Sequence, residues 1–279
     1  MHRVFSRIDD SLVDPLFELF DRGDFVLSST RDIENAWAEV QLYFPENGRI
    51  EEAKRLLAST LSAAGIDAEV QYAEIPDEDW KLSYRRFFTT ERIGSSIAVH
   101  PPWEPYPAGV PVVVTLDPGL AFGTGKHETT RTCLEYIERL APEGGSFMDM
   151  GCGSGILSIA ASKFGFSPVR GFDCDMEAVE ASLRNAAENG VSPEIFKHEL
   201  GAGGTPLAPA DVVVANILGP LLVKFADEIA PVPRRHLVIS GILAKEYGEV
   251  LAAFESRGFA ETDRKTAGEW STGLLKRLS

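Results

Sequence analysis

The stretch that decides the fold is Asp149-Met150-Gly151-Cys152-Gly153-Ser154-Gly155, where a predicted strand leads through a glycine-rich turn directly into a predicted helix. Gly151 and Gly153 lack a Cβ, so a ligand can approach the backbone closely at this turn. Asp173 ends the next predicted strand, at about the distance where a dinucleotide-binding fold places the acid that accepts hydrogen bonds from ribose hydroxyls. The pattern predicts a site for a nucleoside-containing ligand.

The same pattern occurs in nicotinamide enzymes, and two features separate the alternatives. The glycines read G-x-G-x-G rather than G-x-G-x-x-G, and Asp149 precedes the first glycine by two residues, where it would repel a pyrophosphate. S-adenosylmethionine has no phosphate and carries an ammonium and a sulfonium group, which a carboxylate attracts. The sequence favours S-adenosylmethionine as the cofactor over a dinucleotide, and over a glycine-rich turn that binds nothing.

Beyond Val112, apolar strand patterns alternate with helix patterns, as in a parallel sheet that is covered on both faces. The predicted strands are 146–150, 168–173, 194–198, 211–215 and 236–240, and the main predicted helices are 154–164 and 176–189. Asp175 is the expected N-cap of the second helix and Gly190 its stop. The expected fold class is α/β, with a Rossmann-like domain over residues 112–279.

The first 75 residues show a different pattern, with strand and helix signals in the order βαββαβ. The strands are expected at 3–8, 25–27, 37–44 and 68–72, and the helices at 12–20 and 50–64. This order predicts a smaller, ferredoxin-like α+β domain, a platform that commonly serves recognition. Residues 1–75 are therefore expected to form the substrate-recognition domain. Residues 76–111 mix acids, aromatics and prolines, and are expected to form a linker or an irregular subdomain.

Composition narrows the classes of partner. The 279-residue chain has a formal net charge of -15, which argues against direct binding to nucleic acid because phosphate contacts need clustered Lys and Arg. Its three cysteines lack the paired spacing of disulfides or of a zinc site, so no structural metal is expected. No apolar run is long enough to span a bilayer, and no secretion signal is apparent, so the expected location is the cytoplasm. A monomer is the expected state.

Two further runs flank the glycine loop: Asp117-Pro118-Gly119-Leu120-Ala121-Phe122-Gly123-Thr124-Gly125-Lys126-His127-Glu128-Thr129-Thr130 and Ala215-Asn216-Ile217-Leu218. Together with the loop, these runs resemble the PrmA family, whose members methylate ribosomal protein L11 of the large subunit. The resemblance covers roughly residues 80–279, and the D-P-G-x-A-F-G-T-G run is its most specific part. It implies a class I methyltransferase that transfers methyl groups from S-adenosylmethionine to amino groups of ribosomal protein L11.

The resemblance also assigns roles to single residues. Contacts to the cofactor are expected from Thr130, Gly151, Gly153, Asp173 and Asn216. Asn216 follows a strand at the ligand-binding edge of the sheet, so its side-chain oxygen can also orient the amine that accepts the methyl group, which makes it the candidate catalytic residue. This chain passes directly from Asn216-Ile217-Leu218 to Gly219-Pro220, one residue fewer than is usual in the family, beside the acceptor site.

Other interpretations stay open on the sequence alone. His127 is a candidate proton acceptor, although packing or hydrogen bonding within its loop is the favoured role. Cys152 lies at a helix N-terminus that can lower a thiol pKa, but no partner base is evident. A relative that methylates lysines of another protein, such as the β subunit of electron-transfer flavoprotein, is the second enzyme reading. A non-catalytic module that binds a nucleoside is the third. The choice between lysine and N-terminal amine, and the number of methyl groups, are not set by the sequence.

Overall fold

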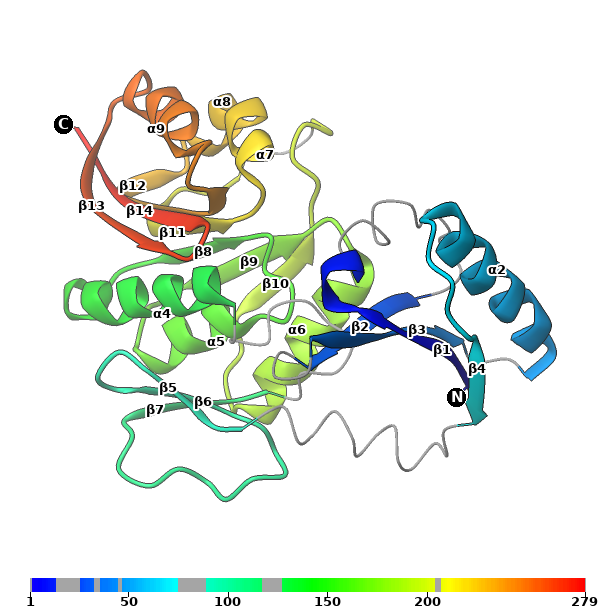
Figure 1. Ribbon diagram of the computed structural model, residues 1–279. Helices are drawn as coiled ribbons and strands as arrows, with labels where there is room; N and C mark the ends of the chain where they lie inside the picture. Colours follow the sequence, from blue (N-terminus) through cyan, green and yellow to red (C-terminus); the bar gives the residue numbers. More distant parts are fainter. Residues whose placement is uncertain are drawn as a thin grey trace. The chain divides into compact units, whose positions relative to one another are not determined.

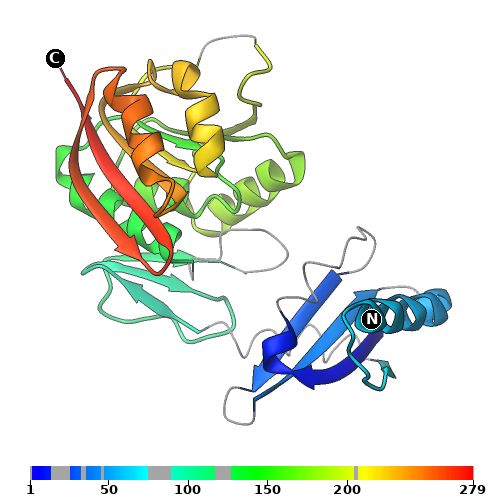
Figure 2. The ribbon, with the colours of Figure 1, turned by 45° about the horizontal axis from the view of Figure 1, so that its top comes forward.

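The protein consists of two compact units, residues 1–87 and 88–279, as Figures 1 and 2 display in two orientations of the computed structural model. The structure describes residues 2–13, 26–32, 36–44, 47–74, 89–116, 127–203 and 207–278. Within these ranges, no helix is both long and apolar enough to cross a membrane. No group of three or more His, Cys, Asp or Glu side chains in the same ranges is arranged to hold a metal ion.

The N-terminal unit is built on a four-stranded antiparallel sheet in the order β2-β3-β1-β4. Its elements are β1 (His2–Asp9), β2 (Val26–Asp32), β3 (Trp37–Phe44), α2 (Ile50–Ala63) and β4 (Gln71–Glu74), with short 3-10 turns at Asp10–Leu12 and Asn47–Arg49. This is the strand order of a ferredoxin-like sheet. The last strand begins three residues later than the sequence predicts, and most of the helix expected at 12–20 lies outside the described residues.

The core of this unit lies between one face of the sheet and α2. Val4 of β1 pairs with Leu42 of β3, and both are fully buried with Leu57 of α2. Successive side chains of a strand point to opposite faces, so this packing leaves the alternate residues of β1 and β3 on the other face of the sheet.

The larger unit contains a seven-stranded sheet in the order β10-β9-β8-β11-β12-β14-β13. The strands are β8 (Phe147–Met150), β9 (Val169–Asp173), β10 (Glu194–Lys197), β11 (Ala210–Asn216), β12 (Pro233–Leu243), β13 (Phe259–Ala267) and β14 (Trp270–Arg277). The first five strands in this order are parallel, and they end within three residues of the predicted bounds. β14 runs antiparallel to both its neighbours, whereas a dinucleotide fold continues with a sixth parallel strand.

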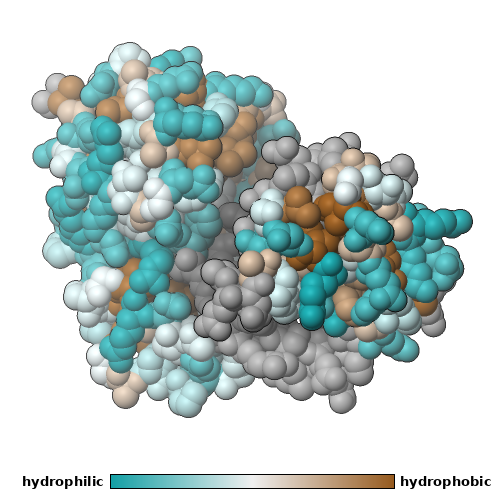
Figure 3. Space-filling view, viewed as in Figure 1, coloured by the Kyte–Doolittle hydropathy of each residue, from teal (hydrophilic) through white to brown (hydrophobic). Residues whose placement is uncertain are grey.

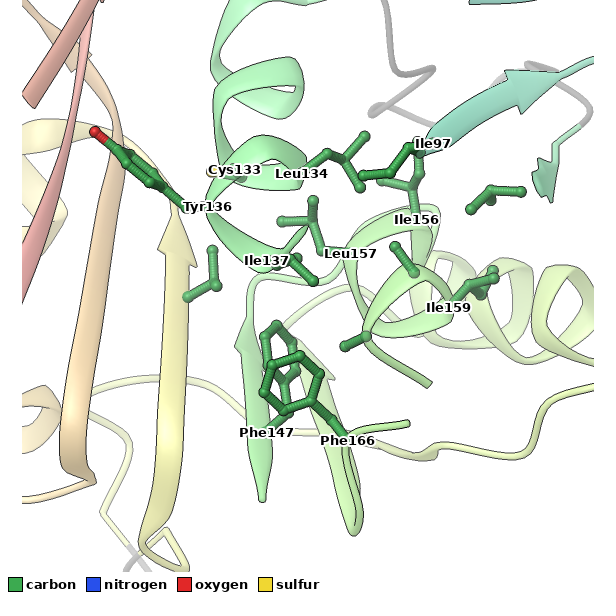
Figure 4. Close-up of a cluster of buried hydrophobic side chains, with 14 of the residues drawn as sticks. Ile97, Cys133, Leu134, Tyr136, Ile137, Phe147, Ile156, Leu157, Ile159 and Phe166 are labelled. Atoms are coloured by element: carbon green, nitrogen blue, oxygen red, sulfur yellow. The ribbon is translucent and has the colours of Figure 1, made fainter. Parts of the chain in front are cut away.

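Helices cover both faces of this sheet (Figure 1). They are α4 (Glu128–Leu140), α5 (Ile156–Lys163) and α6 (Met176–Glu188) on one face, and α7 (Gly219–Lys224), α8 (Ala226–Ile229) and α9 (Tyr247–Glu255) on the other. Figure 4 shows Leu134 and Ile137 of α4 and Leu157 of α5 packed with Phe147 and Phe166. As expected, Asp175 caps α6 by accepting a hydrogen bond from the backbone N–H of Glu177. The sequence pattern did not reveal α4.

The segment expected to be a linker contains regular structure. β5 (Glu91–Ile93) and β6 (Ile97–His100) pair with each other, and β6 pairs with β7 (Val112–Thr115) in a small three-stranded sheet. Glu138 of α4 accepts hydrogen bonds from the backbone N–H and hydroxyl of Ser95 in the β5–β6 turn, which ties this sheet to the larger unit. Of the segment 76–111, residues 89–111 thus contain β5 and β6, and residues 76–88 lie outside the described residues. Strands of three and four residues are too short to give a periodic signal.

Candidate functional site

A cavity of about 1180 Å³ lies at the carboxyl ends of β8, β9, β10 and β11. From β8 the chain turns to α5 on one face of the sheet, and from the neighbouring β11 it turns to α7 on the other face, so the strand order reverses direction here. Such switch points are where open parallel sheets bind ligands. The cavity is lined by Gly151, Gly153, Phe172, Asp173, Cys174, Asp175, Glu177, Ala178, Ala181, Arg184, Asn185, Glu188, His198, Glu199, Leu200, Ile217, Leu221, Lys224 and Phe225.

The glycine loop reaches the cavity in a backbone conformation that favours glycine. Gly151, Gly153 and Gly155 have φ values of 74°, 52° and 79°, which side chains with a Cβ rarely adopt. A Cβ at Gly151 would also come within 2.6 Å of the Ile217 side chain. The backbone N–H groups of Gly151 and Cys152 both donate to the carbonyl of Phe172 at 2.9 Å, which fixes the loop against the end of β9.

Asp173 is held in place by the loop beside it. Its Oδ2 accepts a hydrogen bond from the backbone N–H of Gly153 at 2.9 Å, and its Oδ1 accepts one from the N–H of Asp175 at 3.0 Å. The residue is only half-buried and lines the cavity. Each carboxylate oxygen has further acceptor capacity, so the side chain is oriented by the protein and still able to bind hydroxyl groups of a ligand.

The cavity wall carries more acids than bases. Its carboxylates are Asp173, Asp175, Glu177, Glu188 and Glu199, and its cationic side chains are Arg184 and Lys224. Phe172, Ile217 and Phe225 supply apolar surface. A cationic ligand is favoured by this wall and a pyrophosphate is repelled, so the electrostatic argument for S-adenosylmethionine over a dinucleotide rests on the cavity wall.

Asp149 does not play the part that the sequence suggested. It is fully buried and absent from the lining of the cavity; its Oδ2 accepts hydrogen bonds from the backbone N–H and hydroxyl of Ser158 in α5, at 3.1 and 2.8 Å. Among the described residues its Oδ1 has no hydrogen-bond partner. Burial raises the pKa of Asp149 to about 7. The residue joins β8 to α5 beneath the glycine loop, so the expected direct attraction between this carboxylate and a cofactor is not what the structure displays.

The raised pKa of Asp149 predicts a pH-dependent stability. The folded protein binds this proton more tightly than the unfolded chain, whose Asp pKa is about 3.9, so the free energy of unfolding falls as the pH rises from about 4 to 7. Asn does not ionise, so Asp149→Asn should not show this decrease. We expect the free energy of unfolding of the variant, minus that of the wild type, to rise by roughly 2 kcal/mol between pH 5 and pH 8. Urea unfolding at several pH values measures this.

A matched control is Asp211→Asn. The pKa of Asp211 is lowered by hydrogen bonds from the backbone and side chain of Ser146, so its contribution is lost only below about pH 4. The stability difference between this variant and the wild type should therefore stay constant between pH 5 and 8. A difference for Asp149→Asn that is equally constant would show that Asp149 is ionised throughout this range.

Of the predicted cofactor contacts, Gly151, Gly153 and Asp173 come together in the cavity, while Thr130 does not line its described part. Thr130 is buried in the first turn of α4. Asn216 is half-buried at the end of β11 and directly precedes Ile217, which lines the cavity. Residues 117–126, which include the whole D-P-G-x-A-F-G-T-G run, lie outside the described residues.

The surroundings of His127 and Cys152 indicate that both side chains stabilise the fold. Nδ1 of His127 lies 2.7 Å from Oγ1 of Thr129 at the start of α4, and its ring packs edge-on against Trp270 with centroids 5.1 Å apart. The favoured interpretation of His127, packing and hydrogen bonding, agrees with this geometry. Burial, with Asp149 close by, raises the pKa of Cys152, so the helix N-terminus does not produce a reactive thiolate.

The sequence analysis did not predict that residues of α6 and α7 line the cavity. Glu177, Ala181, Arg184 and Glu188 recur three or four residues apart and form the face of α6 that lines the cavity. That spacing was visible in the sequence. Leu218 and Leu221 are 61% and 37% exposed at the start of α7, where Figure 3 shows hydrophobic side chains gathered on a largely hydrophilic surface. The side of the sheet that α7 occupies becomes known only from the fold.

Comparison with known proteins identifies the family. The family model described as Ribosomal protein L11 methyltransferase (PrmA) matches residues 17–277. The ribosomal protein L11 methyltransferase of Azotobacter vinelandii is 44% identical over 73% of this chain and 70% of its own, and that of Geobacter sulfurreducens is 38% identical over 96% and 94%.

Solved structures agree with the sequence comparison. The crystal structure of ribosomal protein L11 methylase from Lactobacillus delbrueckii subsp. bulgaricus is 30% identical, with a TM-score of 0.63, and covers 69% of this chain and all of its own. The family model spans most of both units, and the relatives match over more than two thirds of their own lengths. The chain therefore belongs to the PrmA family of S-adenosylmethionine-dependent methyltransferases.

Proposed function

We propose that this enzyme transfers methyl groups to amino groups of ribosomal protein L11, at lysine side chains, the N-terminus or both. The observation that carries the proposal is the cavity at the switch point, where Gly151, Gly153 and Asp173 meet a wall rich in carboxylates. The names of its relatives supply the protein substrate. We further propose that the enzyme works as a monomer in the cytoplasm. We also propose that it contacts no nucleic acid, because its net charge of -15 disfavours binding to phosphate groups.

The residues of the cavity fit S-adenosylmethionine. Asp173 is oriented by two backbone N–H groups and can accept hydrogen bonds from ribose hydroxyls. The carboxylates of the wall offset the positive charge of the ligand, and Gly151 and Gly153 leave the backbone open to close approach. When bound, the cofactor supplies a methyl group that its sulfonium already activates. We assign a further contact to Thr130 on the family resemblance alone.

The protein's own chemical task is to position the acceptor amine. A lysine with a pKa of about 10.4 must lose a proton before its lone pair can attack, whereas an N-terminal amine with a pKa near 8 loses it more easily. Asn216 is the residue that we assign to this step. It lies at the carboxyl end of β11, where its side-chain oxygen can accept a hydrogen bond from the amine and point the lone pair toward the cavity.

The test is a transfer assay on a complete set of candidate substrates. Purified enzyme is incubated with methyl-labelled S-adenosylmethionine and ribosomal proteins from cells that lack this gene, and the labelled proteins are identified by mass. We expect label on ribosomal protein L11, and far less of it when Asp173→Ala replaces the wild type at a cofactor concentration near the wild-type Kd. Label on a different protein, with none on ribosomal protein L11, would contradict the substrate assignment and leave the methyltransferase activity standing.

A further inference from the structure

We propose that Asn185, in the last turn of α6, and Asn189, directly after that helix, are positioning residues that join the glycine loop to the end of β7. Through this connection they hold the cofactor site in its binding geometry. The inference rests on the proposed function, from which it takes the cavity as the cofactor site. It adds two side chains that determine the affinity for S-adenosylmethionine through the segments they connect.

The side chain of Asn189 pairs with the backbone of Thr115, the last residue of β7. Its Oδ1 accepts a hydrogen bond from the N–H of Thr115 at 2.8 Å, and its Nδ2 donates to the carbonyl of Thr115 at 2.6 Å. β7 is an edge strand of its sheet, and on the side of β6 the N–H of Leu116 donates to the carbonyl of His100 at 2.9 Å. The amide therefore takes the place of a neighbouring strand at the outer edge of β7.

The end of α6 does not depend on this side chain. Gly190 follows with a φ of 69°, and its N–H donates to the carbonyl of Ala187 at 3.0 Å. The N–H of Val191 donates to the carbonyl of Ala186 at 3.1 Å. A glycine commonly ends a helix through such backbone bonds. The amide of Asn189 is thus used for the contact with β7, and not for capping the helix.

Asn185 connects the end of α6 to the glycine loop. Its Nδ2 donates to the carbonyl of Ser154 at 2.8 Å, and its own backbone carbonyl accepts a hydrogen bond from Nδ2 of Asn189 at 2.8 Å. A continuous series of hydrogen bonds therefore runs from Ser154 through the two asparagines to Thr115. The series begins directly beside Gly153, which lines the cavity.

The segments that this series joins also pack together through apolar side chains. Val114 of β7 is fully buried in the same cluster as Ile156 and Ile159 of α5, the helix that follows the glycine loop. Apolar packing is not directional, so by itself it permits small shifts of β7 along the helix. Hydrogen bonds to both backbone groups of one residue have strict distances and angles, and therefore fix the position of the strand.

The fixed residue lies where the chain leaves β7 for the D-P-G-x-A-F-G-T-G run. The family resemblance makes this run its most specific part and assigns a cofactor contact to Thr130, shortly after it. Holding Thr115 in place relative to Ser154 therefore sets where this run starts relative to the glycine loop. A site that is ordered before the ligand arrives loses less conformational entropy on binding, so the connection should raise the affinity for the cofactor.

The experiment compares Asn189→Ala and Asn189→Asp with Glu138→Ala in the full-length enzyme. Asn189→Asp keeps the size of the side chain and removes its donor, so a carboxylate oxygen faces the carbonyl of Thr115. Glu138→Ala is the matched control, because it removes the polar contact that holds the same small sheet at Ser95, and Glu138 does not line the described part of the cavity. Calorimetry with S-adenosylmethionine gives the Kd, and thermal unfolding gives the melting temperature.

We expect both Asn189 variants to raise the Kd for S-adenosylmethionine about 5- to 20-fold, the factor that corresponds to losing one or two hydrogen bonds. At saturating cofactor their kcat should stay within about threefold of wild type, because the reacting groups are unchanged. Glu138→Ala should lower the melting temperature and leave the Kd within about twofold. A Kd that is unchanged in both Asn189 variants, or raised equally by Glu138→Ala, would overturn the inference.

A double-mutant cycle tests whether the two asparagines act together. Asn185→Ala should raise the Kd by a similar factor, and the variant that combines it with Asn189→Ala should bind the cofactor at most about threefold more weakly than the weaker single variant. A combined effect equal to the product of the two single effects would show that the residues act separately, and would overturn the connection while the proposed function stands. A Kd that is unaffected by Asp173→Ala would show that the cofactor binds elsewhere, and would overturn the proposed site together with this inference.

Discussion

Replacing Asp173 by alanine is expected to weaken the binding of S-adenosylmethionine about 100-fold, the equivalent of about 3 kcal/mol. The variant loses the acceptor for ribose hydroxyls, and it also leaves the backbone N–H groups of Gly153 and Asp175 without the carboxylate that orients the loop. Asp173→Asn keeps one acceptor oxygen and should lose less. Isothermal titration calorimetry with the cofactor measures both variants.

The control is Asp227→Ala, which removes an exposed carboxylate of α8 that pairs with Arg257. Its cofactor affinity should equal that of the wild type, and the melting temperatures of all variants should show that they are folded. Cofactor affinity that is unchanged in Asp173→Ala would place the ribose elsewhere and would remove the main support for the proposed site.

Replacing Asn216 by alanine is expected to reduce kcat about 10²- to 10³-fold, the range found when one precisely placed polar group is removed from an active site. The side-chain oxygen of Asn216 is assigned to the acceptor amine, so its loss leaves the lone pair without orientation. Single-turnover rates at saturating cofactor separate this effect from any weakening of cofactor binding. Asn216→Asp keeps the acceptor oxygen, and should therefore lose less activity than the alanine variant.

A pH profile sharpens the interpretation of Asn216. If the residue orients the amine without taking its proton, Asn216→Ala lowers the rate by the same factor at every pH, because the ionisation of the substrate amine is unchanged. A rate for Asn216→Ala within a few-fold of wild type at saturating cofactor would contradict the catalytic assignment.

Much of the architecture could be predicted because the strongest signals are local. The parallel strands around the glycine loop are buried on both faces, so each appears as a short apolar run between helices. The N-cap at Asp175 likewise depends on one side chain and its near neighbours. The strands β5 and β6 escaped detection because they are very short and gain their stability from β7 and from Glu138, which is distant in sequence.

In the candidate site, too, the residues that are close in sequence could be predicted and those placed by the fold could not. Gly151, Gly153 and Asp173 belong to one strand–turn–helix–strand unit, so their convergence could be read from the sequence. The place of Asp149 could not, because the direction of a side chain on β8 depends on which face α5 covers. The same holds for Lys224 and Phe225, which line the cavity from the end of α7, because the local sequence does not determine which face of the sheet α7 covers.

The most direct test of the central claim is the mass of ribosomal protein L11 isolated from three strains: wild type, a strain without this gene, and that strain carrying Asp173→Ala. We predict that ribosomal protein L11 from the wild type is heavier than that from the strain without the gene by a whole number of methyl groups, located by peptide mapping on lysine or N-terminal amines. The strain with Asp173→Ala should contain a smaller methylated fraction than the wild type. An identical mass of ribosomal protein L11 in all three strains would contradict the account.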